Sequence, residues 1–409
     1  MTVRSNPFSY RFSMRPLLSI VSLLLVFAAA WQSHPPHVLA PFAQATKDTS
    51  PTAAAPQYSS RFVSSQLNDF VHSSSVTALP GGDLMAVWFA GSREGAADVQ
   101  VRTARFDAKS AEWGPEQVLA TRESTRDGTH RYIRKLGNPV IALAPDNRLW
   151  MFYVSVSVGG WATSAINVMV SDDLGTNWSA PRQLITSPFF NISTLVRAAP
   201  VFHADGSIGL PVYHEFMGKF AEYLYLSPDG AVVDKFRISR GKNSLQPTIV
   251  PQDGQRAIAM LRYAGETHHR VLASRTEDAG QTWSEPYPLE PSNPNSSLAA
   301  VSTEGDGLLV ALNDLQDGRF KLSLYGTDAN LNQWRTVVEL DQSPDPLGQP
   351  FSPAAYKEII GEGFRASSGA RRLPLEQRFL SNLDYRVCKP RGCDFEYEYP
   401  YFSRSPDGM

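Results

Sequence analysis

Cysteine is almost absent from this 409-residue sequence, which contains only Cys388 and Cys393. A zinc site takes about four ligands, so two thiols would need further ligands nearby. Four residues separate the pair, and Pro390 and Gly392 among them favour a turn. We therefore predict a local disulfide, which is stable outside the reducing cytoplasm. We expect no metal and no cofactor.

An excess of charge of either sign is also missing. Lys and Arg number 38 and Asp and Glu number 40, which gives a net charge of −2. This balance gives no electrostatic reason to expect nucleic acid or anionic lipid as a partner. Hydrophobic residues make up 42% of the chain and charged residues 19%, as in ordinary globular proteins with an ample core.

Long helical periodicity is absent as well. Short apolar runs recur instead, and those at 84–89, 149–154 and 257–261 each follow a turn that contains Asp with Gly or Asn. Short apolar runs bounded by turns and repeated along the chain are typical of β-strands. The sequence therefore predicts an all-β fold.

Only one apolar run is long, and it lies at 16–31, after Arg4, Arg11 and Arg15. A basic start followed by an apolar run is typical of an export signal. Sixteen residues are short for a membrane-spanning helix, which needs about 20. Ala43-Gln44-Ala45 offers a small-x-small cleavage site.

These features divide the chain. We predict a signal peptide or membrane anchor at 1–45 and a disordered linker rich in Pro, Ala, Ser and Thr at 46–58. Either form of the first segment implies export, so that the body is periplasmic, secreted or membrane-anchored outside the cytoplasm.

A repeat dominates the rest of the chain. Residues 171–178 and 276–283 share a hydroxyl residue, then Asp at the third position, Gly at the fifth and Trp at the eighth. Looser copies lie at 107–113 and 328–334, and a related turn lies at 227–230. Asp binds nearby backbone N–H groups, Gly supplies a positive φ and Trp packs on the returning strand. Such units at intervals near 50 residues are typical of propeller blades.

This repeat resembles the Asp-box of the sialidase (neuraminidase) superfamily, and residues 60–409 resemble bacterial sialidase-like proteins with BNR repeats. Other segments that resemble this group lie at 91–95, 137–139, 211–215, 246–248 and 293–296. The resemblance implies a six-bladed β-propeller over residues 59–409. It also implies an incomplete last blade, because the family has further strands after a turn like that at 406–408.

One part of this region does not fit the repeat. Residues 341–385 contain several prolines and then Arg371 and Arg372, which we interpret as an insertion. We expect it to be partly helical, near 353–360 and near 374–383.

The resemblance also implies catalytic and substrate-binding residues. Tyr399 matches the nucleophile, and Asp98 matches the general acid/base, with Glu94 as the alternative. Arg262 and Arg319 match two of the three arginines that hold the substrate carboxylate.

Two positions depart from the family. Gln246 stands where the family has the Glu that takes the nucleophile's proton, and a neutral amide cannot accept that proton. The first strand has His72-Ser73-Ser74 where the family has the first Arg. His72 is a candidate replacement for the missing cation and Glu215 for the missing base. The predicted substrate-binding residues are therefore Arg262, Arg319, Arg134, Asn138, His72 and Glu215.

The function that this resemblance implies is an exported exo-glycosidase, similar to exo-α-sialidases, that hydrolyses a terminal acidic sugar from glycans. Two alternatives stay open. The chain could be a catalytically altered propeller that binds glycans or a protein partner. It could also be a polysaccharide lyase on the same fold, which would use a Tyr/His pair.

Overall fold

The structure is a computed structural model, and it describes residues 14–33, 38–44, 60–63, 70–187, 191, 193–241, 243–303, 307–368 and 388–404. The chain forms two compact units, Met1–Val38 and Leu39–Met409. The first unit contains helix α1 (Met14–Ser33), which includes the apolar run. Across the described residues we find no helix with the length and apolarity that crossing a membrane requires.

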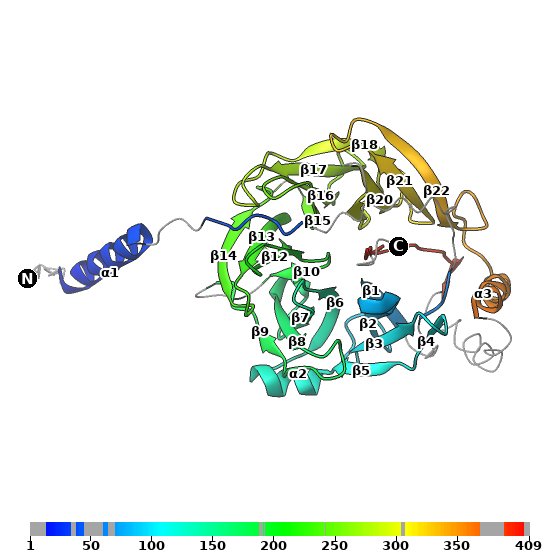
Figure 1. Cartoon of the computed structure of the whole chain (residues 1–409), viewed down its shortest axis with the longest axis horizontal. Coiled ribbons are helices and arrows are strands. Elements are labelled where there is room, and N and C mark those ends of the chain that lie inside the picture. The colour runs from blue at the N-terminus through cyan, green and yellow to red at the C-terminus, as the bar shows by residue number, and fades with distance from the viewer. Residues whose placement is uncertain are drawn as a thin grey trace, which may run out of the picture. The chain divides into compact units, whose positions relative to one another are not determined.

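The second unit is an all-β propeller in which antiparallel sheets are arranged around a ring (Figure 1). Blade 1 contains β1 (Phe70–Ala78), β2 (Leu84–Gly91), β3 (Gln100–Asp107), β4 (Glu112–Trp113) and β5 (Gln117–Ala120). Blade 2 contains β6 (Lys135–Leu143), β7 (Leu149–Val156), β8 (Ser164–Ser171) and β9 (Arg182–Gln183). Blade 3 contains β10 (Leu195–Val196), β11 (Val201–Phe202), β12 (Ile208–His214), β13 (Phe220–Leu226) and β14 (Val232–Arg237).

Two further blades continue the ring. Blade 4 contains β15 (Ser244–Pro251), β16 (Ala257–Tyr263), β17 (Arg270–Thr276) and β18 (Tyr287–Ser292). Blade 5 contains β19 (Ala299–Ser302), β20 (Leu308–Leu312), β21 (Lys321–Thr327) and β22 (Trp334–Gln342). Helical pieces lie between the strands: η1 (Pro80–Gly82), α2 (Arg122–Thr129), η2 (Trp161–Thr163) and, after blade 5, α3 (Pro353–Ser368).

The described residues form five blades, so the expectation of six is wrong. After blade 5, the only strands described are β23 (Cys388–Lys389) and β24 (Gly392–Cys393), which pair with each other. Residues 394–404 then run without regular secondary structure toward the centre of the ring, between β1 and blade 5 (Figure 1). One segment therefore stands where a whole sheet was expected.

The insertion after blade 5 agrees with the sequence where it is described. Helix α3 (Pro353–Ser368) covers the first predicted helical stretch, whereas the second, near 374–383, lies outside the described residues. Cys388 and Cys393 form the predicted disulfide across the β23–β24 hairpin.

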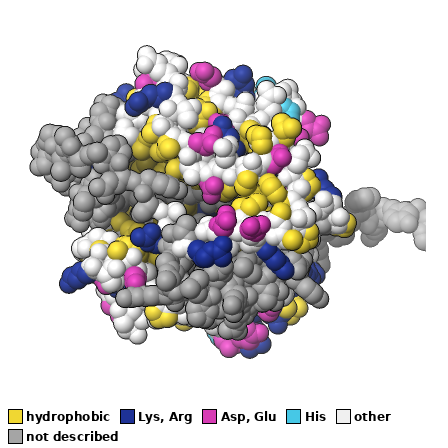
Figure 2. All heavy atoms as spheres, turned by 90° about the vertical axis from the view of Figure 1, so that its right-hand side faces the viewer, with side chains coloured by type: hydrophobic (Ala, Val, Ile, Leu, Met, Phe, Trp, Pro, Cys, Tyr) yellow, Lys and Arg dark blue, Asp and Glu magenta, His cyan; other side chains and the backbone are white. Residues whose placement is uncertain are grey.

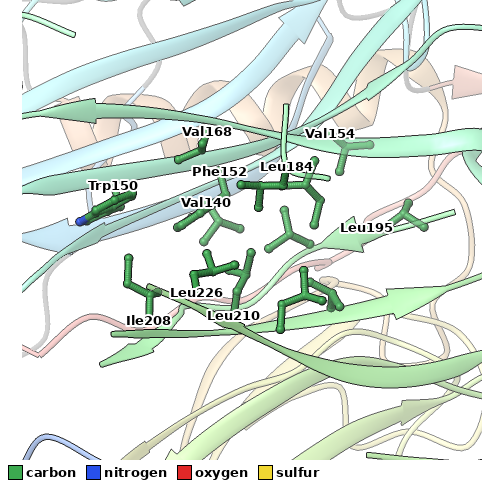
Figure 3. Close-up of a cluster of buried hydrophobic side chains, with 14 of the residues drawn as sticks. Val140, Trp150, Phe152, Val154, Val168, Leu184, Leu195, Ile208, Leu210 and Leu226 are labelled. Carbon is green, nitrogen blue, oxygen red and sulfur yellow. The ribbon is translucent and has the colours of Figure 1, made fainter. Parts of the chain in front are cut away.

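Burial explains why the middle strands are continuously apolar. Every residue of β7 is buried, whereas the outermost strand β22 is largely exposed. Between blades 2 and 3 the sheets pack through interlocking side chains, which include Val140, Phe152, Leu184, Leu210 and Leu226 (Figure 3). On the surface, acidic and basic side chains are intermixed over the side that lies at the right of Figure 1, as Figure 2 shows.

The repeated turns have the structure that their sequence predicted. In the first, Asp173 Oδ1 accepts a hydrogen bond from the backbone N–H of Asn177 at 2.8 Å. This bond contributes most to lowering the pKa of Asp173 to about 2. Gly175 has φ +91°, and the Trp178 indole donates to its carbonyl oxygen at 3.2 Å. The second repeat makes the same bonds from Asp278 and Trp283.

We expected the propeller to begin at residue 59, but a short segment before it, residues 39–43, also binds the propeller. We call it the strap. The backbone N–H of Phe42 donates to the Gly254 carbonyl of blade 4 at 2.8 Å, and that of Ala43 to the Phe202 carbonyl of blade 3 at 2.8 Å. Phe42 is only 1% exposed and packs in the core between these blades. The strap therefore links blades 3 and 4.

Candidate functional site

Left-handed backbone marks the innermost strands at one end of the ring. Ser73, Asn138 and Gln246 have φ of +54°, +45° and +49°, and each lies at a register shift of β1, β6 or β15. Asn295 and Tyr399 have φ of +57° and +56°. This conformation costs of the order of 1–3 kcal/mol for a residue other than glycine, and it clusters at functional sites. These positions lie beside the side chains described next, whereas other left-handed residues, such as Leu174 and Ala279, lie in the repeated turns.

The side chains around these positions form a connected group, which we call the axial site: His72, Arg197, Gln246, Arg262, Arg319, Glu398 and Tyr399. Arg262, on β16, donates to Gln246 Oε1 at 3.2 Å and to Asn295 Oδ1 at 2.7 Å. Arg319 donates to the Asn295 carbonyl oxygen at 2.9 Å. Blades 4 and 5 therefore hold two guanidinium groups near one another.

The C-terminal segment completes this group. Arg319 forms an ion pair with Glu398, and the other carboxylate oxygen of Glu398 lies 3.6 Å from His72 Nε2 on blade 1. The rings of His72 and Tyr399 meet edge to face, with their centroids 4.7 Å apart. Residues 398 and 399 thus bridge blades 5 and 1 at the ring's centre.

Arg197 enters the axial site from blade 3. Its guanidinium donates to the carbonyl oxygens of Tyr399 and Pro400 and lies 4.8 Å from the centroid of the Tyr399 ring. The residue is 2% exposed, and burial is the main cause that lowers its pKa to about 10. Arg197 therefore remains cationic at neutral pH.

Tyr213 lies beneath these groups and joins blades 2, 3 and 4. Its hydroxyl oxygen lies 3.3 Å from Asn138 Nδ2 and 3.4 Å from Gln246 Nε2. Burial is the main cause that raises the pKa of Tyr213 well above 10. Its phenol is therefore neutral at physiological pH, and we assign it a positioning role for Asn138 and Gln246.

Two of the three arginines have no carboxylate partner. Among the described residues, no Asp or Glu forms an ion pair with Arg197 or Arg262, and the Nε of Arg197 is buried without a hydrogen-bond acceptor. A buried cation is costly unless an anion compensates it. Such cations in one site are suited to holding the carboxylate of a ligand.

His72 cannot supply the missing positive charge. Burial, followed by repulsion from Arg197 and Arg319, lowers its pKa from 6.5 to about 4. It is therefore neutral at pH 7, so that its contact with Glu398 is not an ion pair. The third cation of the site comes instead from Arg197.

The low pKa of His72 makes stability depend on pH. Between pH 6.5 and 4 the unfolded chain binds a proton at His72 that the folded chain does not, so acidification favours unfolding. Between pH 7 and pH 5, the free energy of unfolding of the wild type should fall by roughly 2 kcal/mol more than that of a His72→Asn variant. Urea unfolding at the two pH values measures this difference. Parallel losses for the two proteins would contradict a depressed pKa at this residue.

Other predicted residues lie outside the axial site. Both carboxylate oxygens of Asp98 accept hydrogen bonds from Ser92, at 3.0 and 2.9 Å, within the loop that follows β2. Glu94, in the same loop, is exposed and attracts Lys135 electrostatically. This loop leaves β2 where Gly91 pairs with Phe70, near the end of β1 that carries His72. The acid/base role of Asp98 or Glu94 stays a prediction.

Two substrate-binding candidates also lie on loops. Glu215 follows β12, where its backbone N–H donates to Ser193 Oγ at 3.0 Å, and its charge contributes to the raised pKa of Tyr213. Arg134 lies just before β6 and donates to the Gly159 carbonyl oxygen at 3.3 Å. We find no group of three or more His, Cys, Asp or Glu side chains in the described parts that could hold a metal.

Sequence reasoning missed three members of the site and its support. Arg197 follows the apolar Leu195 and Val196, and a lone arginine after a buried strand is a signal that could have identified it. Glu398 stands beside the predicted nucleophile but has no counterpart in the residues that the resemblance carried over. Tyr213 was noted only as part of a resembling segment.

Comparisons with known proteins agree with this architecture. The model of the BNR repeat-like domain family matches residues 82–409. No curated protein matches this chain. Solved structures are similar at low identity, which shows a shared fold. The Hadza microbial sialidase Hz136 is 15% identical with a TM-score of 0.55, over 66% of this chain and 59% of that protein.

Two further solved structures are similar. The intramolecular trans-sialidase from Ruminococcus gnavus is 13% identical with a TM-score of 0.54, over 67% of this chain and 85% of that protein. The NanB sialidase from Streptococcus pneumoniae is 9% identical with a TM-score of 0.55, over 70% of this chain and 64% of that protein. The chain thus spans less than two thirds of the Hadza and Streptococcus proteins.

Proposed function

Because this chain belongs to the BNR repeat-like domain family, we propose that it is an exported glycosidase that acts on a terminal acidic sugar. The observation that carries the proposal is the pair of arginines, Arg197 and Arg262, without carboxylate partners in the axial site. Arg319, which pairs with Glu398, adds a third cation, and three is the number that the sialidase resemblance implies for one substrate carboxylate.

Tyr399 is the proposed nucleophile. Its oxygen would attack the anomeric carbon as the glycosidic bond breaks, and the leaving oxygen would take a proton from Asp98 or Glu94. Water would then release the sugar from Tyr399. Gln246 cannot accept the proton of Tyr399. The ring of His72 contacts Tyr399, but burial and the neighbouring Arg197 and Arg319 lower its pKa and make it a weak base, so the proposed acceptor is Glu215.

Arg262→Ala tests the proposal. Removing one charge-assisted contact should weaken binding of a free acidic sugar by roughly 1.5–3 kcal/mol, which is about 10- to 150-fold in Kd. Isothermal titration of the wild type and the variant with a panel of acidic monosaccharides measures this change. Arg335→Ala, at an exposed position on β22, serves as the control.

Two results would refute the proposal. The first is a wild-type protein that neither binds nor cleaves any acidic sugar of the panel. The second is an Arg262→Ala variant that binds them as tightly as the wild type, because the carboxylate would then lie elsewhere.

One contact favours a second candidate function, that of a polysaccharide lyase. The edge-to-face pair of His72 and Tyr399 provides two groups that can move protons next to the arginines. A lyase would remove the proton beside the neutralised carboxylate and expel the glycosidic oxygen, which leaves a carbon–carbon double bond in the product. Hydrolysis leaves no double bond, so ultraviolet absorbance of the products separates the two reactions.

Export is part of the proposal, supported by the basic and apolar start of the chain and by the Cys388–Cys393 disulfide. The strap restricts how an export signal could be removed. Cleavage after Ala45 would remove residues 39–43, which bind blades 3 and 4. We therefore place any cleavage before residue 39.

A further inference from the structure

The segment between α2 and β6 carries basic and aromatic side chains outward from the axial site. Helix α2 begins at a capping box formed by Thr121 and Ser124 and ends at His130, which has φ +54°. Residues 131–134 then lead into β6, and the backbone N–H of Arg134 donates to the Val156 carbonyl oxygen at 2.8 Å. Ile133 is buried and fixes the segment on blade 2.

This segment is continuous with the axial site. Asn138, four residues after Arg134, contacts Tyr213 beneath the axial site. Four residues of chain span at most about 14 Å, so Arg134 lies within that distance of Asn138. Arg134 precedes β6, on the side of Asn138 that leads away from the strand.

The two arginines of the segment are exposed and carry no counter-charge. Among the described residues, no carboxylate forms an ion pair with Arg131 or Arg134, and Arg134 is oriented by its bond to the Gly159 carbonyl oxygen at 3.3 Å. The nearby Lys135 differs, because Glu94 offsets its charge. Arg131 and Arg134 are therefore available to a negatively charged ligand.

Two aromatic rings accompany these charges. Tyr132 is 66% exposed, so its ring is open to a ligand. Trp161 is partly buried, and Lys135 Nζ lies 3.8 Å from the centroid of its ring. A Cβ at position 137 would lie 2.5 Å from Trp161, so the glycine there lets the indole rest on β6.

We propose that Arg131, Tyr132 and Arg134 form an outer subsite for a second acidic sugar of the same substrate. Guanidinium groups bind carboxylates bidentately, and an exposed aromatic ring offers an apolar face to a pyranose. This inference rests on the proposed function and narrows its substrate to an acidic oligosaccharide with at least two carboxylates, one for each cluster of arginines.

The test compares one acidic monosaccharide with an oligosaccharide of at least two units of the same sugar. Kd is measured by titration for the wild type, Arg131→Ala/Arg134→Ala and Arg126→Ala. Arg126 is an exposed arginine on α2 that pairs with Asp127, so its variant removes a nearby charge without touching the subsite. The quantity of interest is each protein's preference for the oligosaccharide over the monosaccharide.

We expect the wild type and Arg126→Ala to bind the oligosaccharide more tightly than the monosaccharide by the same factor. In the double variant this ratio of Kd values should fall at least tenfold. Tyr132→Ala should lower the preference too. A wild type that binds the monosaccharide without preferring the oligosaccharide, or a double variant with an unchanged preference, overturns the subsite alone. A wild type that binds neither sugar overturns the proposed function as well.

Discussion

Tyr399→Phe is expected to lower turnover of an acidic glycoside by about a thousandfold or more, because it removes the atom that would form the covalent bond. The substitution should leave the fold intact. The contacts of the Tyr399 side chain with His72 and Arg197 are made by its ring, which phenylalanine keeps. Binding of the free acidic sugar should therefore change far less than turnover.

The matched control is Tyr397→Phe, two residues earlier in the same segment. Its hydroxyl interacts with Asp341 of β22, away from the axial site. Initial rates on a fluorogenic acidic glycoside are compared for the three proteins at substrate saturation. If Tyr399→Phe keeps most of its turnover while Tyr397→Phe behaves as wild type, Tyr399 is not the nucleophile.

Phe42→Ala is expected to cost about 3–5 kcal/mol in the free energy of unfolding, the usual effect of deleting a buried aromatic side chain. The residue is 1% exposed and belongs to the core cluster that includes Tyr223 and Leu261. Its backbone pairs with His203 at an isolated bridge. Urea unfolding followed by tryptophan fluorescence measures the change.

Gln44→Ala provides the comparison, because Gln44 is exposed and its side chain donates one hydrogen bond, at 3.3 Å, to the Phe42 carbonyl oxygen. Its free energy of unfolding should stay within about 0.5 kcal/mol of wild type. If Phe42→Ala also changed stability by less than about 1 kcal/mol, the strap would not bind the propeller in solution as it does in the structure.

The sequence predicted the blades through their turns. Each repeated turn connects the two outermost strands at one edge of a blade. These turns lie at 107–113, 171–178, 227–230, 276–283 and 328–334. They number five, as do the blades. The sixth blade came only from the resemblance. The Ser-Pro-Asp-Gly sequence of the turn at 227–230 does recur at 405–408, but this stretch lies outside the described residues.

The axial site was harder to predict because it depends on which strand ends meet. Arg262, Arg319, Tyr399 and Gln246 match family positions, and the structure brings them together. Arg197 was missed because the resemblance placed the first arginine on the first strand, in blade 1. The guanidinium of Arg197 comes from blade 3, and only the arrangement of the blades around the ring reveals this. The backbone strain at Gln246 and Tyr399 likewise has no signal in sequence alone.

The C-terminal segment has a consequence for biosynthesis. Residues 399–403 contact blades 1, 2 and 3, through the bonds of Ser403 with Ala78, of Tyr401 with Ile141 and of Arg197 with the Tyr399 carbonyl. A ribosome makes these residues after all five blades, so a nascent chain can fold its sheets one by one while the centre of the ring stays open. Tyr399, the proposed nucleophile, and the groups that contact it would then come together late in synthesis. A chain interrupted before residue 397 would keep its blades but lack Glu398 and Tyr399 of the axial site.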